Sequence, residues 1–205
     1  LDLDQADFSI TELIDQISDL VAIKAHQKGI EFIIKIDPNV PDSFIGDANR
    51  IRQVLINIVN NAIKFTLTGE VLLSVYFSTE KRSLIFSIKD TGIGMTEEQT
   101  NKVFDRFTQA NEKISAQFGG TGLGLSISKK LIELMDGKIS INSEIQIGTE
   151  VIIEIKLPIS ENQPIESKYN IQLDLKNKKV LIVDDNQHNR IILSEFLIKH
   201  EATFD

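Results

Sequence analysis

Hydrophobic and polar positions follow two different periods along the chain, and this change of period predicts a mixed α/β fold. Between residues 10 and 28 apolar side chains recur every three or four positions, as on one face of a helix. Ser9 and Glu12 form a capping box at its start, and Gly29 is expected to end it. A second helix, from Asp47 to about Phe65, has its own apolar stripe: Ile51, Val54, Leu55, Ile58 and Ala62.

The segments after each of these two helices have the pattern of β-strands. "IEFIIKID" (30–37) reads as one strand, and "EVLLSVYF" (70–77) with "SLIFSIKD" (83–90) predicts a hairpin across the turn "STEKR". A short helix near 96–105, a helix after a glycine cluster, and strands at 138–144 and 148–158 follow. We therefore expect an α/β (α+β) fold, with helices on one face of a mixed, mostly antiparallel sheet.

Four segments are expected. Residues 1–8 form an extended lead-in, 9–159 a large α/β domain, 160–177 a polar linker, and 178–205 the start of a second domain. Because the chain begins at Leu1, we expect a piece of a longer protein, whose membrane anchor, if present, would lie elsewhere. No apolar run approaches the roughly 18 to 20 residues of a membrane span.

Composition narrows the classes of function. The 205 residues are 41% hydrophobic, enough for one good core and part of another. A net charge of −8 argues against nucleic acid as the main partner. The absence of cysteine excludes disulfides, zinc–thiolate clusters and thiol nucleophiles, and fits a cytosolic setting.

The second helix carries the first candidate chemistry. Asn57, Asn61 and Lys64 fall at i, i+4 and i+7, away from the apolar stripe. Asparagine carbonyls suit Mg²⁺ and a lysine ammonium suits phosphate. A plain solvated face is the alternative.

Two glycine-containing motifs supply further candidate binding residues. In "KDTGIGM", Asp90 ends a strand and could accept a hydrogen bond from an exocyclic amine, while Gly92 and Gly94 would let a flat ring approach the backbone. An ordinary turn is the alternative. In "FGGTGLGL", four glycines next to a helix start leave backbone N–H groups open to phosphate, and could form a lid: Gly119, Gly120, Gly122 and Gly124.

In this order, "NIVNNAIKFT", "DTGIGM", "VFDRF" and "FGGTGLGL" resemble the N, G1, F and G2 boxes of the catalytic ATP-binding domain of sensor histidine kinases, over roughly residues 40 to 157. The resemblance implies a two-layer α/β sandwich of the GHKL, or Bergerat, type that binds ATP and Mg²⁺. It implies that Asn57 and Asn61 bind Mg²⁺ and phosphate oxygens, Lys64 binds phosphate, Phe65 packs near adenine, and Asp90, supported by Thr149, binds the adenine amine. The remaining ATP-site residues that it implies are Gly92, Gly94, Met95, Gly119, Gly120, Thr121, Gly122, Leu123 and Gly124.

The resemblance also implies the reaction. ATPase relatives carry a general-base glutamate where this chain has Asn57, which cannot take a proton from water, so we expect slow hydrolysis. The family instead transfers phosphate to a histidine on a dimeric helical hairpin that this chain lacks, so no catalytic nucleophile lies in the chain. His26, His188 and His200 are expected to be ordinary surface or packing residues. Gln109 stands where many relatives have arginine, so the resemblance does not imply a basic phosphate contact in the F box.

The last segment, "KKVLIVDDNQHNRIILSEFLIKHEATFD", resembles the first strand and helix of a flavodoxin-like response-regulator receiver, with Asp184 and Asp185 as the Mg²⁺-binding acid pair. Acids that merely end a strand are the alternative. So short a segment is not expected to fold alone.

Two hypotheses remain open. The first is the catalytic part of a hybrid histidine kinase, located on the cytoplasmic side of the membrane. Its partners would be the hairpin of the same protein, in a homodimer, and a receiver or response regulator; this piece alone would be a monomer. The second is a nucleotide-sensing or scaffold module without transfer.

Overall fold

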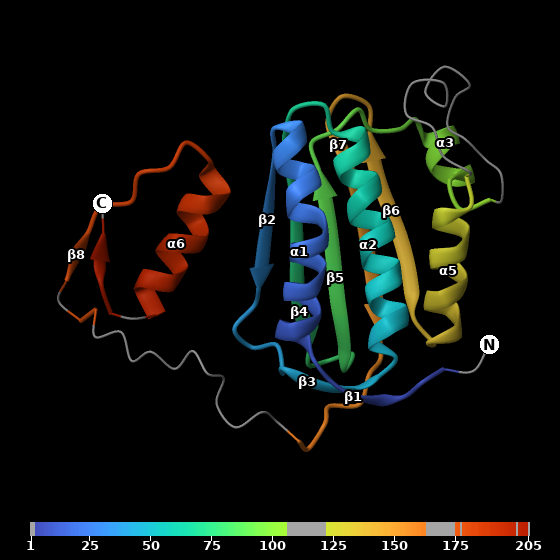
Figure 1. The fold of residues 1–205 in the computed structure, drawn as a ribbon, viewed down its shortest axis with the longest axis horizontal. Helices are drawn as coiled ribbons and strands as arrows, with labels where there is room; N and C mark the ends of the chain where they lie inside the picture. Colours follow the sequence, from blue (N-terminus) through green and yellow to red (C-terminus); the bar gives the residue numbers. More distant parts are fainter. Residues whose placement is uncertain (1–2, 106–121, 163–174, 177, 200, 205) are drawn as a thin grey trace. The chain divides into compact units, whose positions relative to one another are not determined.

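The computed structural model describes residues 3–105, 122–162, 175–176, 178–199 and 201–204 (Figure 1). The chain divides into two compact units, residues 1–163 and 164–205, with the division inside the predicted linker. The elements of the first unit are β1 (Ala6–Ser9), α1 (Ile10–Lys28), β2 (Ile30–Ile36), β3 (Ser43–Gly46), α2 (Ala48–Phe65), β4 (Gly69–Ser78), β5 (Ser83–Asp90), α3 (Glu97–Lys102), α5 (Gly124–Leu134), β6 (Lys138–Glu144) and β7 (Gly148–Ile155). The second unit contains β8 (Lys179–Val180), α6 (Gln187–Lys199) and β9 (Thr203–Phe204).

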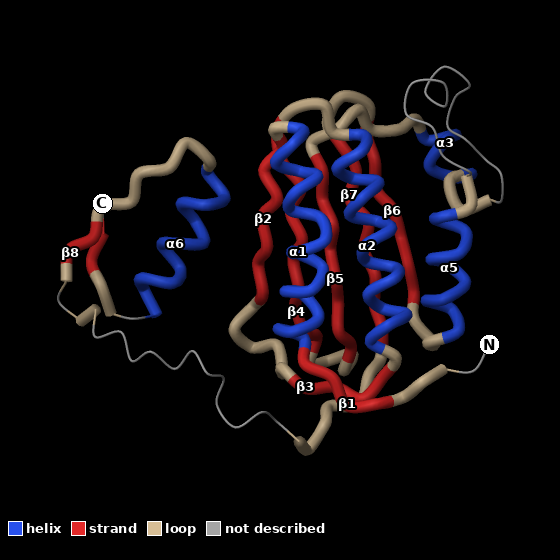
Figure 2. The backbone as a smooth tube through the Cα atoms, in the orientation of Figure 1, coloured by secondary structure: helices blue, strands red, loops and turns tan. Residues whose placement is uncertain are grey.

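A five-stranded sheet forms the framework of the first unit. Its strand order is β2, β4, β5, β7, β6, in which β2 runs parallel to β4 and every other neighbouring pair is antiparallel. Figure 2 shows α1, α2 and α5 side by side over one face of this sheet. The predicted arrangement, with helices on one face of a mostly antiparallel sheet, is confirmed.

The core lies between this helical layer and the sheet. The apolar stripes predicted on α1 and α2 are buried: Ile10, Leu13, Ile14, Ile17 and Val21 on α1, and Ile51, Val54, Leu55, Ile58 and Ala62 on α2. The Ser9 side chain accepts from the Glu12 N–H, which is one half of the predicted capping box, and Gly29 ends α1 in a left-handed conformation as expected. Within the described ranges, no helix is both long and apolar enough to cross a bilayer.

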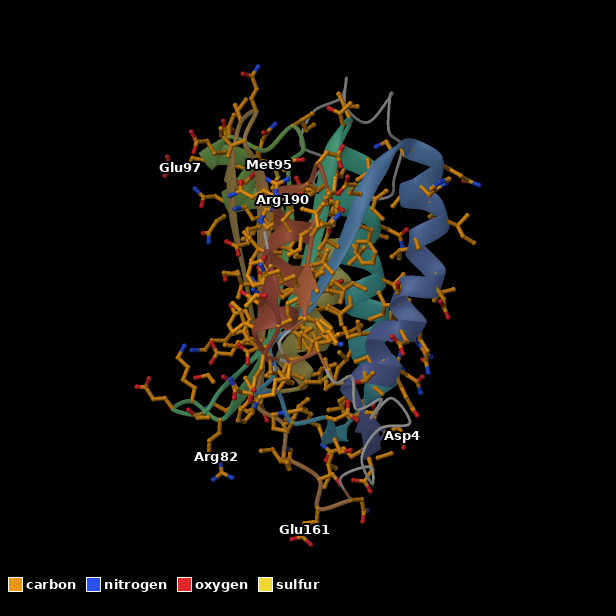
Figure 3. The ribbon with its side chains drawn as sticks, turned by 90° about the vertical axis from the view of Figure 1, so that its left-hand side faces the viewer. Asp4, Arg82, Met95, Glu97, Glu161 and Arg190 are labelled. Atoms are coloured by element: carbon orange, nitrogen blue, oxygen red, sulfur yellow. The ribbon has the colours of Figure 1, made fainter. Side chains whose placement is uncertain are left out.

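A small second sheet joins the two ends of this unit. β1 pairs antiparallel with β3, a strand that the sequence analysis did not predict. On the other side of β3, the Ile45 N–H donates to the Pro158 carbonyl. On β1, the Asp7 carboxylate accepts from the Asn162 side chain at 3.0 Å. Hydrogen bonds from Ser160 and Asn162 lower the pKa of Asp7. Figure 3 shows Asp4 and Glu161 at the end of the unit opposite Met95.

The described part of the second unit contains a strand, a helix and a second strand. β8 and β9 pair in parallel through two residues each, and α6 connects them. The strand predicted over "VLIV" is wrong beyond Val180, because residues 181–183 lie outside any strand and the side chains of Leu181 and Val183 are 72% and 83% exposed. The two-residue β9 offers too short an edge to pair a longer strand.

Candidate functional site

Three polar side chains line one face of α2 at the predicted spacing. Asn57, Asn61 and Lys64 are each half-buried, as is Phe65 at the end of the helix. The Lys64 ammonium lies 4.8 Å from the centroid of the Phe65 ring. Two carboxamides and an ammonium in line can bind a hard cation and an anion together.

The carboxyl end of α2 is held by a lysine that the sequence analysis did not identify. The Lys28 ammonium, at the end of α1, donates to the carbonyls of Ile63 at 2.7 Å, Lys64 at 2.7 Å and Thr66 at 2.6 Å. These carbonyls are among those that an α-helix leaves without intrahelical partners. Burial lowers the pKa of Lys28. Lys28 therefore stabilises the turn of α2 that carries Lys64 and Phe65.

The Asn57 side chain faces α5. Its Nδ2 donates to the Ser128 hydroxyl at 2.8 Å, and a Cβ added at Gly124 would lie 2.5 Å from its Oδ1. With the nitrogen bound to Ser128, the carbonyl oxygen is the atom left to coordinate a cation. This neutral oxygen donor fits Mg²⁺, which usually takes only a few protein ligands and shares them with phosphate.

Asp90 ends β5 as a buried carboxylate that is bound on one side. It is 7% exposed, and its Oδ1 accepts from the backbone N–H groups of Gly92 at 2.8 Å and Thr149 at 3.1 Å. In the described part of the chain, both of these hydrogen bonds end on Oδ1, so Oδ2 keeps its capacity to accept. Burial raises the pKa of Asp90, and the two backbone hydrogen bonds oppose that shift. Thr149 thus supports Asp90 through its backbone rather than its side chain.

The glycines after Asp90 have a packing role that the sequence analysis did not foresee. A side chain at Gly92 would lie 2.6 Å from the Phe65 carbonyl oxygen, and one at Gly94 would overlap the Glu144 carbonyl. The Ile93 N–H also donates to the Phe65 carbonyl at 3.2 Å. The loop is therefore packed between the end of α2 and the β6–β7 turn.

Ser143 joins this loop to the sheet. Its hydroxyl donates to the Gly148 carbonyl at 3.0 Å and accepts from the Met95 N–H at 2.9 Å. Because that donation uses its only hydrogen, the 2.8 Å contact with Thr149 Oγ1 has threonine as the donor. The sequence analysis missed Ser143, although it lies opposite Thr149 in the β6–β7 hairpin.

Part of the glycine-rich segment can be placed. Gly122 has a φ of 68°, Leu123 is the N-cap of α5, and among the described residues no side chain caps the start of this helix. Its first N–H groups therefore remain suited to bind an anion. Gly119, Gly120, Thr121 and Gln109 lie outside the described residues.

Asp184, the first acid of the predicted pair, has a local structural role. Asp184 accepts from the Asn186 N–H at 2.8 Å, and its carbonyl accepts from Arg190 at 2.6 Å, while Asp185 is exposed. Among the described residues, no group of three or more His, Cys, Asp or Glu side chains could hold a metal ion. His26 is exposed on α1, His188 lies in the first turn of α6, and His200 is outside the described residues.

The candidate site, formed by α2, the loop after Asp90 and the start of α5, lies within a stretch that matches a known family. Residues 46–159 match the model of the histidine kinase-, DNA gyrase B-, and HSP90-like ATPases. The chain belongs to this family. The match spans α2, Asp90, Thr149 and α5, so the elements that form the site are those of a family of ATPases.

Similar proteins narrow the family to kinases. The signal transduction histidine-protein kinase BarA of Shigella flexneri is 38% identical over 187 residues, 90% of this chain and 20% of BarA. The hybrid signal transduction histidine kinase B of Dictyostelium discoideum is 33% identical, over 93% of this chain and 11% of that protein. The crystal structure of full-length ShkA in complex with AMPPNP matches with a TM-score of 0.80 and 27% identity, over 100% of this chain and 41% of that chain.

The chain therefore spans a fifth or less of the length of these curated relatives. Together, the family match and the kinase relatives identify the ATP-binding catalytic part of a two-component histidine kinase.

Proposed function

We propose that this chain binds Mg-ATP between α2, the loop after Asp90 and the start of α5. The observation that carries the proposal is the one-sided anchoring of Asp90. An ionised carboxylate whose Oδ1 is bound by two backbone N–H groups directs Oδ2 to a ligand donor, and the exocyclic amine of adenine is such a donor. AMPPNP, the molecule in the ShkA complex, is an analogue of ATP and carries that amine.

The phosphates would lie between α2 and the start of α5. Lys64 would bind a phosphate by charge, and the first N–H groups of α5 would bind another with the help of the helix dipole. Asn57 and Asn61 would supply carbonyl oxygens to Mg²⁺, which neutralises charge on the transferring phosphoryl group when it is bound. Gly119, Gly120 and Thr121 would complete the lid.

We expect phosphoryl transfer rather than hydrolysis. Asn57 has no basic group at neutral pH that could take a proton from water. The acceptor would be a histidine on a dimerisation hairpin elsewhere in the intact homodimer, and phosphate would then pass to a receiver aspartate. Residues 178–205 would be the first strand and helix of such a receiver, an interpretation supported by the name of the hybrid relative. In the complete receiver, Asp184 and Asp185 would contribute to a second Mg²⁺ site.

Binding is tested first, by calorimetric titration of the chain with AMPPNP, with and without Mg²⁺, beside Asp90→Ala. Magnesium-dependent binding that is largely lost in Asp90→Ala is the expected result. Asp19→Ala, which removes an exposed carboxylate from α1, is the matched control and should bind as the unmodified chain does. A folded chain that binds no AMPPNP at millimolar concentration would contradict the proposal.

Transfer is tested next, in the intact protein with its hairpin. Acid-labile phosphate on the protein after incubation with Mg-ATP is expected. If the dimer binds ATP yet accumulates no such phosphate, the chain is a nucleotide-sensing or scaffold module instead.

A further inference from the structure

Ser128 is the residue through which α5 contacts the predicted metal ligand. It is 1% exposed, lies one turn into α5, and accepts from Asn57 Nδ2 at 2.8 Å. The two residues are 71 positions apart in the sequence. A buried hydroxyl at hydrogen-bond distance from the amide of a site residue restrains where that amide lies, because moving the amide away would cost the hydroxyl this partner.

Gly124 forms the other half of the contact. It precedes Ser128 by four residues, so both lie on one face of α5. A Cβ at Gly124 would be 2.5 Å from Asn57 Oδ1 but 3.1 Å from Nδ2, so the amide oxygen lies closer to the first residue of the helix. The amide is thus oriented along α5, with its nitrogen toward Ser128 and its oxygen toward the helix start, where an anion would bind.

We propose that Ser128 is a positioning residue for magnesium: it holds the Asn57 amide with Oδ1 facing the cation that accompanies the nucleotide phosphates. This inference rests on the proposed function and deepens it. Ser128 itself touches neither the nucleotide nor the metal. Its removal should therefore weaken binding only when Mg²⁺ is present and only while Asn57 is there to be positioned.

The experiment compares Ser128→Ala with the unmodified chain in titrations with AMPPNP. Without Mg²⁺ the two should bind equally. With Mg²⁺, Ser128→Ala should bind about 3- to 10-fold more weakly, as expected for the loss of one orienting hydrogen bond, and should need more Mg²⁺ for half-saturation. Ser126→Ala is the matched control, since Ser126 is also buried on α5 but donates to the Leu123 carbonyl.

A double-mutant cycle separates positioning from general damage to α5. In the background of Asn57→Ala, the change Ser128→Ala should have no further effect, because residues that act through one another are not additive. Ser128→Cys keeps the side-chain volume with a weaker acceptor and serves if Ser128→Ala unfolds.

The inference would be overturned if Ser128→Ala lowered the affinity for AMPPNP equally with and without Mg²⁺, or did not lower it at all. It would also be overturned if Ser128→Ala lowered this affinity as much in the Asn57→Ala background as in the unmodified chain. If the unmodified chain binds no nucleotide, the proposed function fails first, so the two failures are distinguishable.

Discussion

Replacing Asp90 with asparagine should weaken nucleotide binding while leaving the loop in place. The introduced amide could still accept the Gly92 and Thr149 N–H groups on its carbonyl oxygen, so the change is confined to the side that would face adenine. On that side, Asn would present an NH₂ donor in place of the Oδ2 acceptor, and this donor would face the adenine amine, which is also a donor. A hydrogen bond to a charged group contributes about 1.5 to 3 kcal/mol, so we expect affinity to fall by about 10- to 100-fold.

The same substitution should stabilise the unliganded fold near neutral pH. Burial raises the pKa of Asp90 in the folded state, so the folded chain holds this proton more tightly than the unfolded chain does. The contribution of Asp90 to stability is therefore fully present below its ordinary pKa of about 3.9 and is lost as the pH rises through the raised folded value. Asparagine does not ionise and avoids this loss.

Urea unfolding of both proteins at several pH values, together with the AMPPNP titration, tests the reasoning. The variant should be more stable than the unmodified chain at pH 7, and this difference should shrink as the pH falls toward about 4. Asp19→Asn, at an exposed position on α1, is the control for a simple change of net charge. Unchanged affinity would refute the role of Oδ2, and a stability difference independent of pH would refute the role of burial.

Three further substitutions probe the framework of the site. Gly148→Ala should destabilise the fold by at least about 2 kcal/mol in urea unfolding, because Gly148 has a φ of 131° and a side chain would overlap the Asp90 carbonyl. Lys28→Met keeps the aliphatic stem but removes three hydrogen bonds to the end of α2, and should lower the free energy of unfolding by about 1 kcal/mol, again measured with urea. Ser143→Ala should weaken AMPPNP binding about threefold in calorimetry while circular dichroism stays unchanged, because the Met95 N–H loses its acceptor.

Much of the fold could be predicted because its signals are local. The apolar stripes of α1 and α2, the Ser9 cap, Gly29 and the β4–β5 hairpin depend on residues a few positions apart, and all are confirmed. β3 escaped prediction because its four residues form a strand only between β1 and the segment around Pro158, which pair with it from distant parts of the sequence.

The candidate site likewise has features that the sequence predicted and features that it could not predict. The order and spacing of the motifs predicted which side chains belong together, and the family match bears out the ATP-binding class. The resemblance implied that Thr149 supports Asp90, but not that it does so through its backbone N–H. The spacing could not reveal two further contacts: Ser128 with Asn57, and Lys28 with the end of α2.

By itself, then, the sequence determined most elements of the first unit, the class of the domain and the list of candidate ligands, because periodicity, caps and motif spacing act over short stretches of chain. Only the tertiary structure decided which oxygen of Asp90 is bound and which way the Asn57 amide turns. Asp90 Oδ1 accepts from the nearby Gly92 N–H and also from Thr149, 59 positions away, while the Asn57 amide is bound by Ser128, 71 positions away. The two long-range bonds exist only once the sheet and the helical layer have packed.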